Sequence, residues 1–221
     1  MPHIHPINTA LFMTFRLYDS IPDMVYWKWE EELKEKIEYI KDMPVSLFHK
    51  QEMIYREQKL HFKKMDNYLH VDSKSEKYLI IPEIGQLVHD KIVGFHEKRY
   101  NLICSSVMPN HVHLLFEDYQ LKTPETNILG KDKDYPVAQT MRYIKGGTAR
   151  EANSILGKTG NFWQKESYDH YIRNDNEMDN VINYILQNPV KAGLVDDWTL
   201  WPWTYLVDYP SDAQHKCYAT K

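Results

Sequence analysis

The stretch that decides the fold runs from Tyr100 to Glu117 and reads YNLICSSVMPNHVHLLFE. Two short apolar runs, Tyr100–Met108 and Val112–Glu117, are separated by Pro109 and Asn110, residues that favour a turn. Apolar runs of this length on either side of a turn are typical of two adjacent antiparallel strands. We therefore predict a pair of strands here, and read the chain outward from them.

Periodicity on both sides of this pair predicts an alternation of strands and helices. The expected elements are a strand at 9–18, a helix from Pro82 to near Arg99, a helix at 136–156 with a bend or close backbone approach at Gly146 and Gly147, a strand ending at Ile172, and a helix that begins at Asn174 or Asp175 and stops at Pro189. This order predicts an α+β fold: a ferredoxin-like split βαβ antiparallel sheet followed by a further helix.

Residues 23–75 break this alternation. Glu, Lys, Trp and Met dominate the segment, and Trp29 to Asp42 (WEEELKEKIEYIKD) is dense in charge. Such a composition favours a solvated helix, and Pro44 should end it before a second helix at 45–67. We expect a helical insertion after the first strand, which need not have a binding role.

His111 and His113 are the first candidates for chemistry. Residues two apart on a strand point to the same side, so both imidazoles could hold one metal ion. The spacing alone is weak, because His3 and His5 share it near the N-terminus, where we expect a frayed tail.

Tyr184 and Asn188 are the second pair of candidates. They lie four residues apart on the helix before Pro189 and therefore share one side of it. Taken alone, the pair also fits a tyrosine at the edge of the core and an asparagine that caps the helix.

Four blocks together change this balance. They are Met108 to Leu115 (MPNHVHLL), Phe162 to Gln164 (FWQ), Asp169 to Arg173 (DHYIR) and Asn183 to Gly193 (NYILQNPVKAG). In this order they resemble the signature blocks of the REP-associated tyrosine transposases, a branch of the HUH single-strand DNA transposases. Trp201 to Tyr205 (WPWTY) is similar to a tryptophan-proline segment that often follows the tyrosine helix in the family. The resemblance covers 78–209 and the first strand, and leaves 23–75 unexplained.

The resemblance implies a single HUH transposase domain over 1–221, with the first strand in 8–22, the insertion in 23–75, the catalytic core in 76–196 and a C-terminal tail in 197–221. It makes His111 and His113 the metal-binding pair, Tyr184 the nucleophile and Asn188 the third metal ligand. A tyrosine hydroxyl is a weak nucleophile near neutral pH, so a divalent cation must polarise the phosphate. Mg²⁺ and Mn²⁺ both suit two imidazoles and an amide. Attack would leave a 5′-phosphotyrosine and a free 3′-hydroxyl, and a second 3′-hydroxyl could then complete strand transfer.

The expected partner is single-stranded or hairpin DNA. Net charge is −4 with a pI near 6.3, so a DNA site must be a local patch. Candidates for such a groove are Arg142, Lys145, Arg150, Trp163, Lys165, Arg173 and Lys191. Trp163 could stack a base or equally be buried between sheet and helix.

Composition excludes some other classes. No run approaches a membrane helix and the N-terminus shows no signal peptide, so we expect a cytoplasmic protein without membrane contact, either a monomer or a homodimer. Cys104 and Cys217 support neither a disulfide framework nor a thiolate zinc site. The alternative function is a non-catalytic DNA-binding protein that keeps the fold. A metal oxygenase would want a carboxylate ligand and more strands, and would leave the tyrosine without a task.

Overall fold

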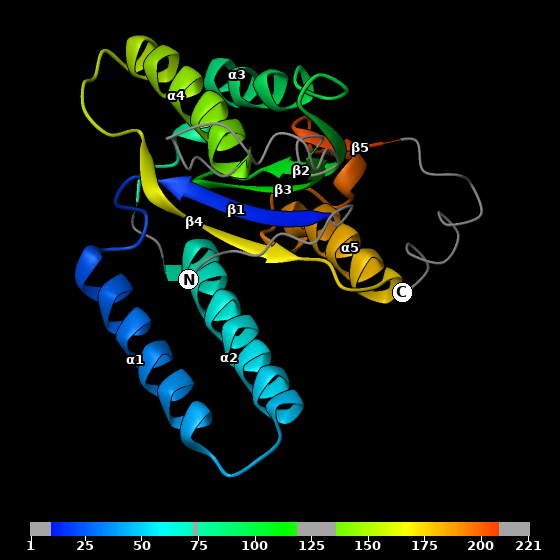
Figure 1. Ribbon diagram of the computed structural model, residues 1–221. Helices are drawn as coiled ribbons and strands as arrows, with labels where there is room; N and C mark the ends of the chain where they lie inside the picture. Colours follow the sequence, from blue (N-terminus) through cyan, green and yellow to red (C-terminus); the bar gives the residue numbers. More distant parts are fainter. Residues whose placement is uncertain (1–9, 73–74, 119–135, 208–221) are drawn as a thin grey trace, which may run out of the picture. The chain divides into compact units, whose positions relative to one another are not determined.

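The computed structural model describes residues 10–72, 75–118 and 136–207, and these form two compact units (Figure 1). The sheet unit comprises residues 1–16 and 77–221, and the hairpin unit comprises residues 17–76. His3, His5, Thr9, Cys217 and the polar segment 119–135 lie outside the described residues. Among the described residues, no helix combines the length and apolar character that crossing a membrane requires.

The sheet unit is built on five strands in the order β4-β1-β3-β2-β5. They are β1 (Leu11–Leu17), β2 (Tyr100–Val107), β3 (His111–Asp118), β4 (Trp163–Tyr171) and β5 (Thr204–Leu206). β3 lies antiparallel between β1 and β2, and β5 adds to the free edge of β2. The expected α+β class and its ferredoxin-like sheet are confirmed, because the first four strands have the 4-1-3-2 order of a split βαβ fold.

Helices α3 (Pro82–Val93) and α4 (Pro136–Leu156) lie on one face of the sheet (Figure 1). The buried Tyr100 of β2 donates its hydroxyl to the carbonyl of Ile92 in α3 at 2.6 Å. Trp163 of β4 donates its indole N–H to Thr148 of α4 at 2.9 Å. These two hydrogen bonds satisfy the buried Tyr100 hydroxyl and Trp163 N–H and help to fix both helices to the sheet.

Two expectations for these helices need correction. The helix from Pro82 ends at Val93 rather than near Arg99, because the chain turns back at Gly94 and Glu97, where φ is +60° and the backbone N–H donates to Tyr100. Helix α4 continues through Gly146 and Gly147, and a Cβ at Gly147 would lie 3.0 Å from the side chain of Lys91 in α3. Gly147 therefore makes room for the side chain of Lys91 rather than for another backbone.

Helix α5 (Asp175–Lys191) packs on β2 and β3 from the opposite face. Asn174 caps its start by accepting from the N–H of Glu177 at 3.0 Å, as predicted. The expected stop at Pro189 is wrong. Proline lacks an N–H but fits in the last turn. The helix ends at Lys191 and is followed by Gly193, whose φ of +67° suits glycine.

The segment after α5, expected as a tail, forms the fifth strand of the sheet. The backbone N–H of Val107 donates to the carbonyl of Trp203 at 3.0 Å, and β5 then pairs with β2. Trp203 packs against Gly85 of α3 so closely that a Cβ there would lie 2.6 Å from the indole ring and from the carbonyl of Leu79. Only glycine allows this contact.

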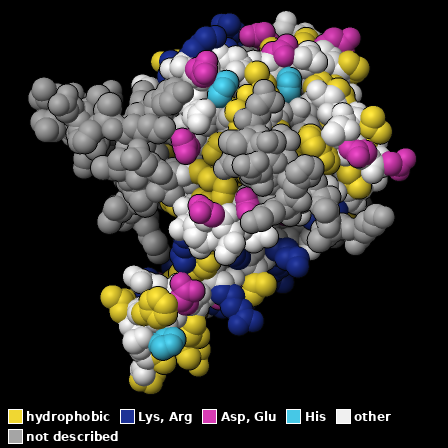
Figure 2. All heavy atoms as spheres, turned by 90° about the vertical axis from the view of Figure 1, so that its right-hand side faces the viewer, with side chains coloured by type: hydrophobic (Ala, Val, Ile, Leu, Met, Phe, Trp, Pro, Cys, Tyr) yellow, Lys and Arg dark blue, Asp and Glu magenta, His cyan; other side chains and the backbone are white. Residues whose placement is uncertain are grey.

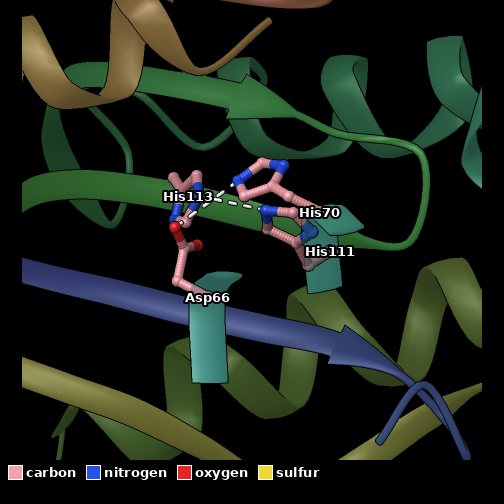
Figure 3. Close-up of side chains that lie close together, drawn as sticks. All are labelled: Asp66, His70, His111 and His113. Atoms are coloured by element: carbon pink, nitrogen blue, oxygen red, sulfur yellow. Dashed lines mark hydrogen bonds and ion pairs between the residues drawn. The ribbon is translucent and has the colours of Figure 1, made fainter. Parts of the chain in front are cut away.

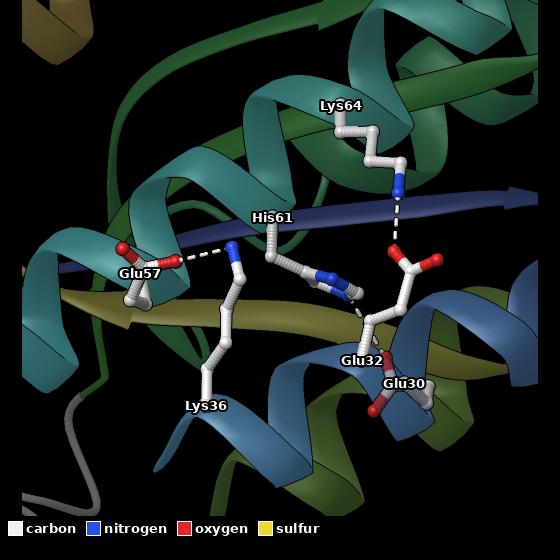
Figure 4. A network of polar contacts seen from close by, with 6 residues as sticks. All are labelled: Glu30, Glu32, Lys36, Glu57, His61 and Lys64. Atoms are coloured by element: carbon white, nitrogen blue, oxygen red, sulfur yellow. Dashed lines mark hydrogen bonds and ion pairs between the residues drawn. The ribbon is translucent and has the colours of Figure 1, made fainter. Parts of the chain in front are cut away.

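The hairpin unit contains the two expected helices, α1 (Asp23–Asp42) and α2 (Leu47–Asn67), and a single π-helical turn, η1 (Tyr68–Asp72). Ser46 caps α2 by accepting from the N–H of His49 at 3.3 Å. Three polar pairs join the helices (Figure 4): Lys36–Glu57 at 2.8 Å, His61–Glu30 at 3.0 Å and Lys64–Glu32 at 2.7 Å. The hydrogen bond from Lys64 lowers the pKa of Glu32.

Candidate metal and nucleophile site

His111 and His113 project from one side of β3, as strand geometry predicts, and both side chains are buried. The register with β1 places Thr14 directly opposite His113 and Arg16 directly opposite His111. Residues opposite one another in an antiparallel pair share a face of the sheet. Four side chains from two strands are therefore gathered on the face that α5 covers.

Hydrogen bonds orient the two imidazoles. The amide oxygen of Asn110 accepts from His111 Nδ1 at 2.7 Å, so His111 Nε2 carries the lone pair. His113 Nδ1 lies 2.8 Å from Thr14 Oγ1. The two Nε2 atoms face one another at 3.1 Å, and Figure 3 shows both rings turned toward the same point in front of β3. This is the orientation that metal-binding histidines adopt when a neighbour holds the other ring nitrogen.

The distance between the two Nε2 atoms provides a test of the metal prediction. Two imidazole nitrogens bound to one cation at about 2.1 Å each, about 90–110° apart, would lie about 3.0–3.4 Å from one another. The observed 3.1 Å fits this range. The two histidines of β3 could thus bind one cation without a change of their side-chain positions.

Helix α5 brings Tyr184 to this pair. The ring centroid of Tyr184 lies 5.2 Å from that of His113 and 5.9 Å from that of Phe12 on β1. Lys191, two turns further along α5, holds its ammonium 5.6 Å from the centre of the same ring. The predicted nucleophile and one predicted ligand are therefore in contact, although 71 positions separate them in the chain.

Asn188 lies one turn beyond Tyr184 on α5 and is 1% exposed. Within the described part of the chain, its side-chain Nδ2 has no hydrogen-bond partner. A buried amide without a partner is costly, which marks the position as one where a polar group is kept for a reason other than packing. Its role as third ligand stays a prediction.

The predicted DNA-contacting cations fall into two groups. Five of them have exposed side chains: Arg142, Arg150, Lys165, Arg173 and Lys191. Lys145 is instead held against β4, where it donates to the carbonyl of Lys165 at 2.9 Å and to Ser167 Oγ at 3.2 Å. Burial lowers the pKa of Lys145 to about 8, with Arg16 adding to the effect and Glu166 opposing it.

Trp163 belongs to the core. It is 6% exposed, its N–H is bonded to Thr148, and its ring packs 4.9 Å from that of Phe15. These contacts favour the buried alternative over base stacking.

The sequence reading missed Arg16. Its side chain is 6% exposed, and it stands opposite His111. The only signal was a single charge within the apolar strand Leu11–Leu17 (LFMTFRL). Its place beside His111 depends on the pairing register of β1 and β3, which local sequence does not reveal.

The hairpin unit has a polar pair of its own that the sequence reading also missed. Asp66 Oδ2 and His70 Nε2 are 3.4 Å apart, four residues along the chain where α2 passes into η1; both are labelled in Figure 3. Residues four apart meet on one side of a helix, but the predicted second helix ended at 67 and left His70 outside it. A carboxylate and an imidazole are both common metal ligands.

The chain is similar to known proteins in both sequence and structure. No known family profile matches the chain. A protein from Haemophilus influenzae named putative REP-associated tyrosine transposase is 26% identical over 114 residues, which cover 48% of this chain and 58% of that protein. The resemblance drawn from the four blocks is confirmed by this relative, of whose length the chain spans 58%. A solved structure of a REP-associated tyrosine transposase bound to a REP hairpin has a TM-score of 0.49 and 16% identity, covering 92% of this chain and 80% of that one.

Proposed function

We propose that this chain is a metal-dependent single-strand DNA endonuclease and strand transferase of the REP-associated tyrosine transposase type, acting through a 5′-phosphotyrosine on hairpin-forming repeat DNA. One observation carries the proposal: the ring of Tyr184 lies 5.2 Å from His113, whose Nε2 faces that of His111 at 3.1 Å. A tyrosine ring in contact with one of two histidines whose Nε2 atoms face one another suits metal-assisted attack on a phosphodiester.

In this proposal His111 and His113 hold Mg²⁺ or Mn²⁺ through their Nε2 atoms, and Asn188 supplies a third ligand. The bound cation would polarise the phosphate and offset the charge that develops on it. Asn110 and Thr14 keep the two rings in position through their Nδ1 atoms.

Tyr184 attacks the phosphorus through its hydroxyl oxygen. The new bond joins Tyr184 Oη to phosphorus, and the bond from phosphorus to the 3′ oxygen breaks. The proton that the phenol loses is balanced by the one that the leaving 3′ oxygen gains. Phe12 and His113, which both contact the ring, hold it in place before attack. Attack by another 3′-hydroxyl on the phosphotyrosine reverses the step and joins a new strand.

We propose that Arg16 also binds the phosphate. A guanidinium can donate two hydrogen bonds to phosphate oxygens at once, and Arg16 stands opposite His111 on the face that carries Tyr184. Its charge would help to neutralise the five-coordinate phosphorus in the transition state. We place the reaction in the cytoplasm and leave monomer and homodimer as alternatives.

The decisive experiment replaces Tyr184 with Phe, which keeps the ring packing and removes the attacking oxygen. Wild type incubated with a labelled hairpin and Mn²⁺ should form a protein-DNA adduct that survives a denaturing gel, and Tyr184→Phe should form none. DNA affinity should change by no more than about 1 kcal/mol. Tyr168→Phe is the matched control, because Tyr168 also contacts Phe12 but comes from β4.

Equal adduct from wild type and Tyr184→Phe would move the nucleophile elsewhere, with Tyr168 and Tyr171 the next candidates. Tight DNA binding without any adduct from wild type would instead favour the non-catalytic DNA-binding protein.

A further inference from the structure

Helix α2 of the hairpin unit carries a shallow groove, which we name the α2 groove. Its apolar lining comes mainly from Met53, Tyr55 and Leu60. Its charged lining is three cations, Arg56, Lys59 and Lys63, and one carboxylate, Glu52. Leu60 is 48% exposed, although a leucine in a two-helix unit is normally turned toward the partner helix. Figure 2 shows hydrophobic side chains, in yellow, gathered on the hairpin at the bottom of the view.

The α2 groove is separate from the contact that holds the hairpin together. Glu57, His61 and Lys64 form one stripe of α2 and pair with α1 (Figure 4). Met53, Arg56, Leu60 and Lys63 follow one another at three- and four-residue steps and form a neighbouring stripe. The α2 groove therefore lies on a different stripe of α2 from the three pairs that join the helices.

Charge in the hairpin unit is segregated between the two helices. Helix α1 has seven Asp and Glu against four Lys, whereas α2 has five Lys and Arg against three Asp and Glu. The whole chain is acidic, with a net charge of −4, so a basic groove stands out against it. This distribution favours an anionic occupant for the α2 groove.

We infer that the α2 groove binds single-stranded DNA, namely the unpaired flank of the hairpin substrate. Sites for single strands combine a row of cations with aromatic or apolar surfaces on which bases lie. Arg56, Lys59 and Lys63 cover about 10 Å along the helix axis, enough to meet a few successive phosphates. Tyr55 lies beside this row, with the Lys59 ammonium 4.4 Å from its ring centre. A DNA occupant rests on the proposed function, but the groove and its charge do not.

The test compares wild type with the variant Arg56→Gln/Lys59→Gln/Lys63→Gln, using a DNA hairpin with a single-stranded flank and the same hairpin trimmed of its flank. Affinity for the flanked hairpin, measured by fluorescence anisotropy at several salt concentrations, should fall at least tenfold. The dependence of log affinity on log salt should weaken by about 2, because three phosphate contacts to a single strand are lost. Affinity for the trimmed hairpin should change less than threefold.

The matched control is Lys28→Gln/Lys34→Gln/Lys41→Gln, which removes three exposed lysines from α1 and should bind both DNAs as wild type does. Circular dichroism checks that each triple variant keeps its helix content. Equal loss in the control would reduce the effect to net charge and overturn the inference. Equal loss on the trimmed hairpin would overturn the single-strand occupant in favour of a duplex stem.

Two further readouts separate this inference from others. A groove variant that binds DNA normally but loses self-association of the wild type in sedimentation would overturn the inference and assign the groove to a second copy of the chain. A groove variant with weaker DNA binding, in a protein that never forms the Tyr184 adduct, would support the groove while rejecting the proposed function.

Discussion

The sheet unit and the hairpin unit use polar residues in opposite ways. In the sheet unit, His111, His113 and Asn188 are buried, and neighbours such as Asn110 hold the histidine rings through single hydrogen bonds. In the hairpin unit, most polar pairs lie at the surface between two helices, as in Lys64 and Glu32, whose side chains are each 43% exposed. Burial fixes geometry, which a reaction requires, whereas exposed charge gives attraction without fixed geometry. The difference teaches that fixed geometry and surface charge are divided between two parts of one chain, and we propose chemistry for the first and DNA attraction for the second.

We expect the largest loss of activity when a buried histidine of the sheet unit is replaced, compared with a histidine of the hairpin unit. His113→Ala should abolish adduct formation with Mg²⁺ and with Mn²⁺, because one of the two proposed histidine ligands is lost. Loss of the contact with Thr14 should also lower the free energy of unfolding by about 1–3 kcal/mol. His61→Ala is the control from the hairpin unit, and it should leave the adduct yield unchanged. Undiminished cleavage by His113→Ala in chelator-treated buffer would exclude the metal assignment.

Arg16 should give the next largest effect. Arg16→Gln removes a charge from the proposed phosphate position, so the single-turnover cleavage rate should fall roughly 100-fold. Arg16→Lys should recover part of this rate. Arg99→Gln is the control, because Arg99 packs 3.8 Å from the ring centre of Tyr143. If Arg16→Gln only lowers thermal stability and cleaves at the wild-type rate, Arg16 is structural.

Removal of the hairpin unit tests whether the sheet unit alone keeps the cleavage activity. A chain with 19–75 replaced by a short linker should keep the sheet register and form the Tyr184 adduct within about tenfold of wild type, because the proposed nucleophile and ligands all lie outside the deletion. Its preference for flanked over trimmed hairpin should fall by about tenfold. A shortened chain that stays folded yet cleaves nothing would place part of the active site in the hairpin unit.

The smallest expected effect concerns Lys145. Its pKa of about 8 means that the ammonium is protonated below that pH and loses its charge as pH rises through it. DNA affinity should therefore fall by a few fold between pH 7 and pH 9, and Lys145→Arg, which stays charged, should remove this fall. Anisotropy at constant ionic strength measures it. An identical pH profile in both proteins would show that Lys145 does not contact DNA.

Local pattern was enough to predict the strands around His111 and the capped start of α5. These depend on alternation, turn residues and an N-cap, which act over a few positions. The end of α3 was misplaced because Phe95 continues the apolar period, while the turn at Glu97 depends on a positive φ and a hydrogen bond to Tyr100 that apolar periodicity does not show. Pro189 was predicted to stop α5 because proline breaks a helix interior. The prediction was wrong because the missing N–H matters less in a last turn.

The site itself was predicted only in part, for a reason of distance along the chain. The HxH spacing predicted that His111 and His113 share one side of a strand. The four sequence blocks predicted Tyr184 as the nucleophile. Arg16 joins them only through the register of β1 with β3, about 95 residues away. β5 was read as tail because three residues are too few for an alternation, and its pairing depends on Trp203 fitting against Gly85.

The contact of Trp203 with Gly85 bears on how the sequence can vary. In a library that samples every substitution, Gly85 should tolerate as little change as Tyr184, since any side chain there displaces an indole that anchors the C-terminal strand. Selection for activity alone would show the same intolerance to substitution at Gly85 and at Tyr184. Selection for soluble expression should separate them, because Phe at 184 leaves the packing intact whereas Ala at 85 does not. Without the second screen, intolerance to substitution would suggest that Gly85 is a functional residue, although its role is to make room for Trp203.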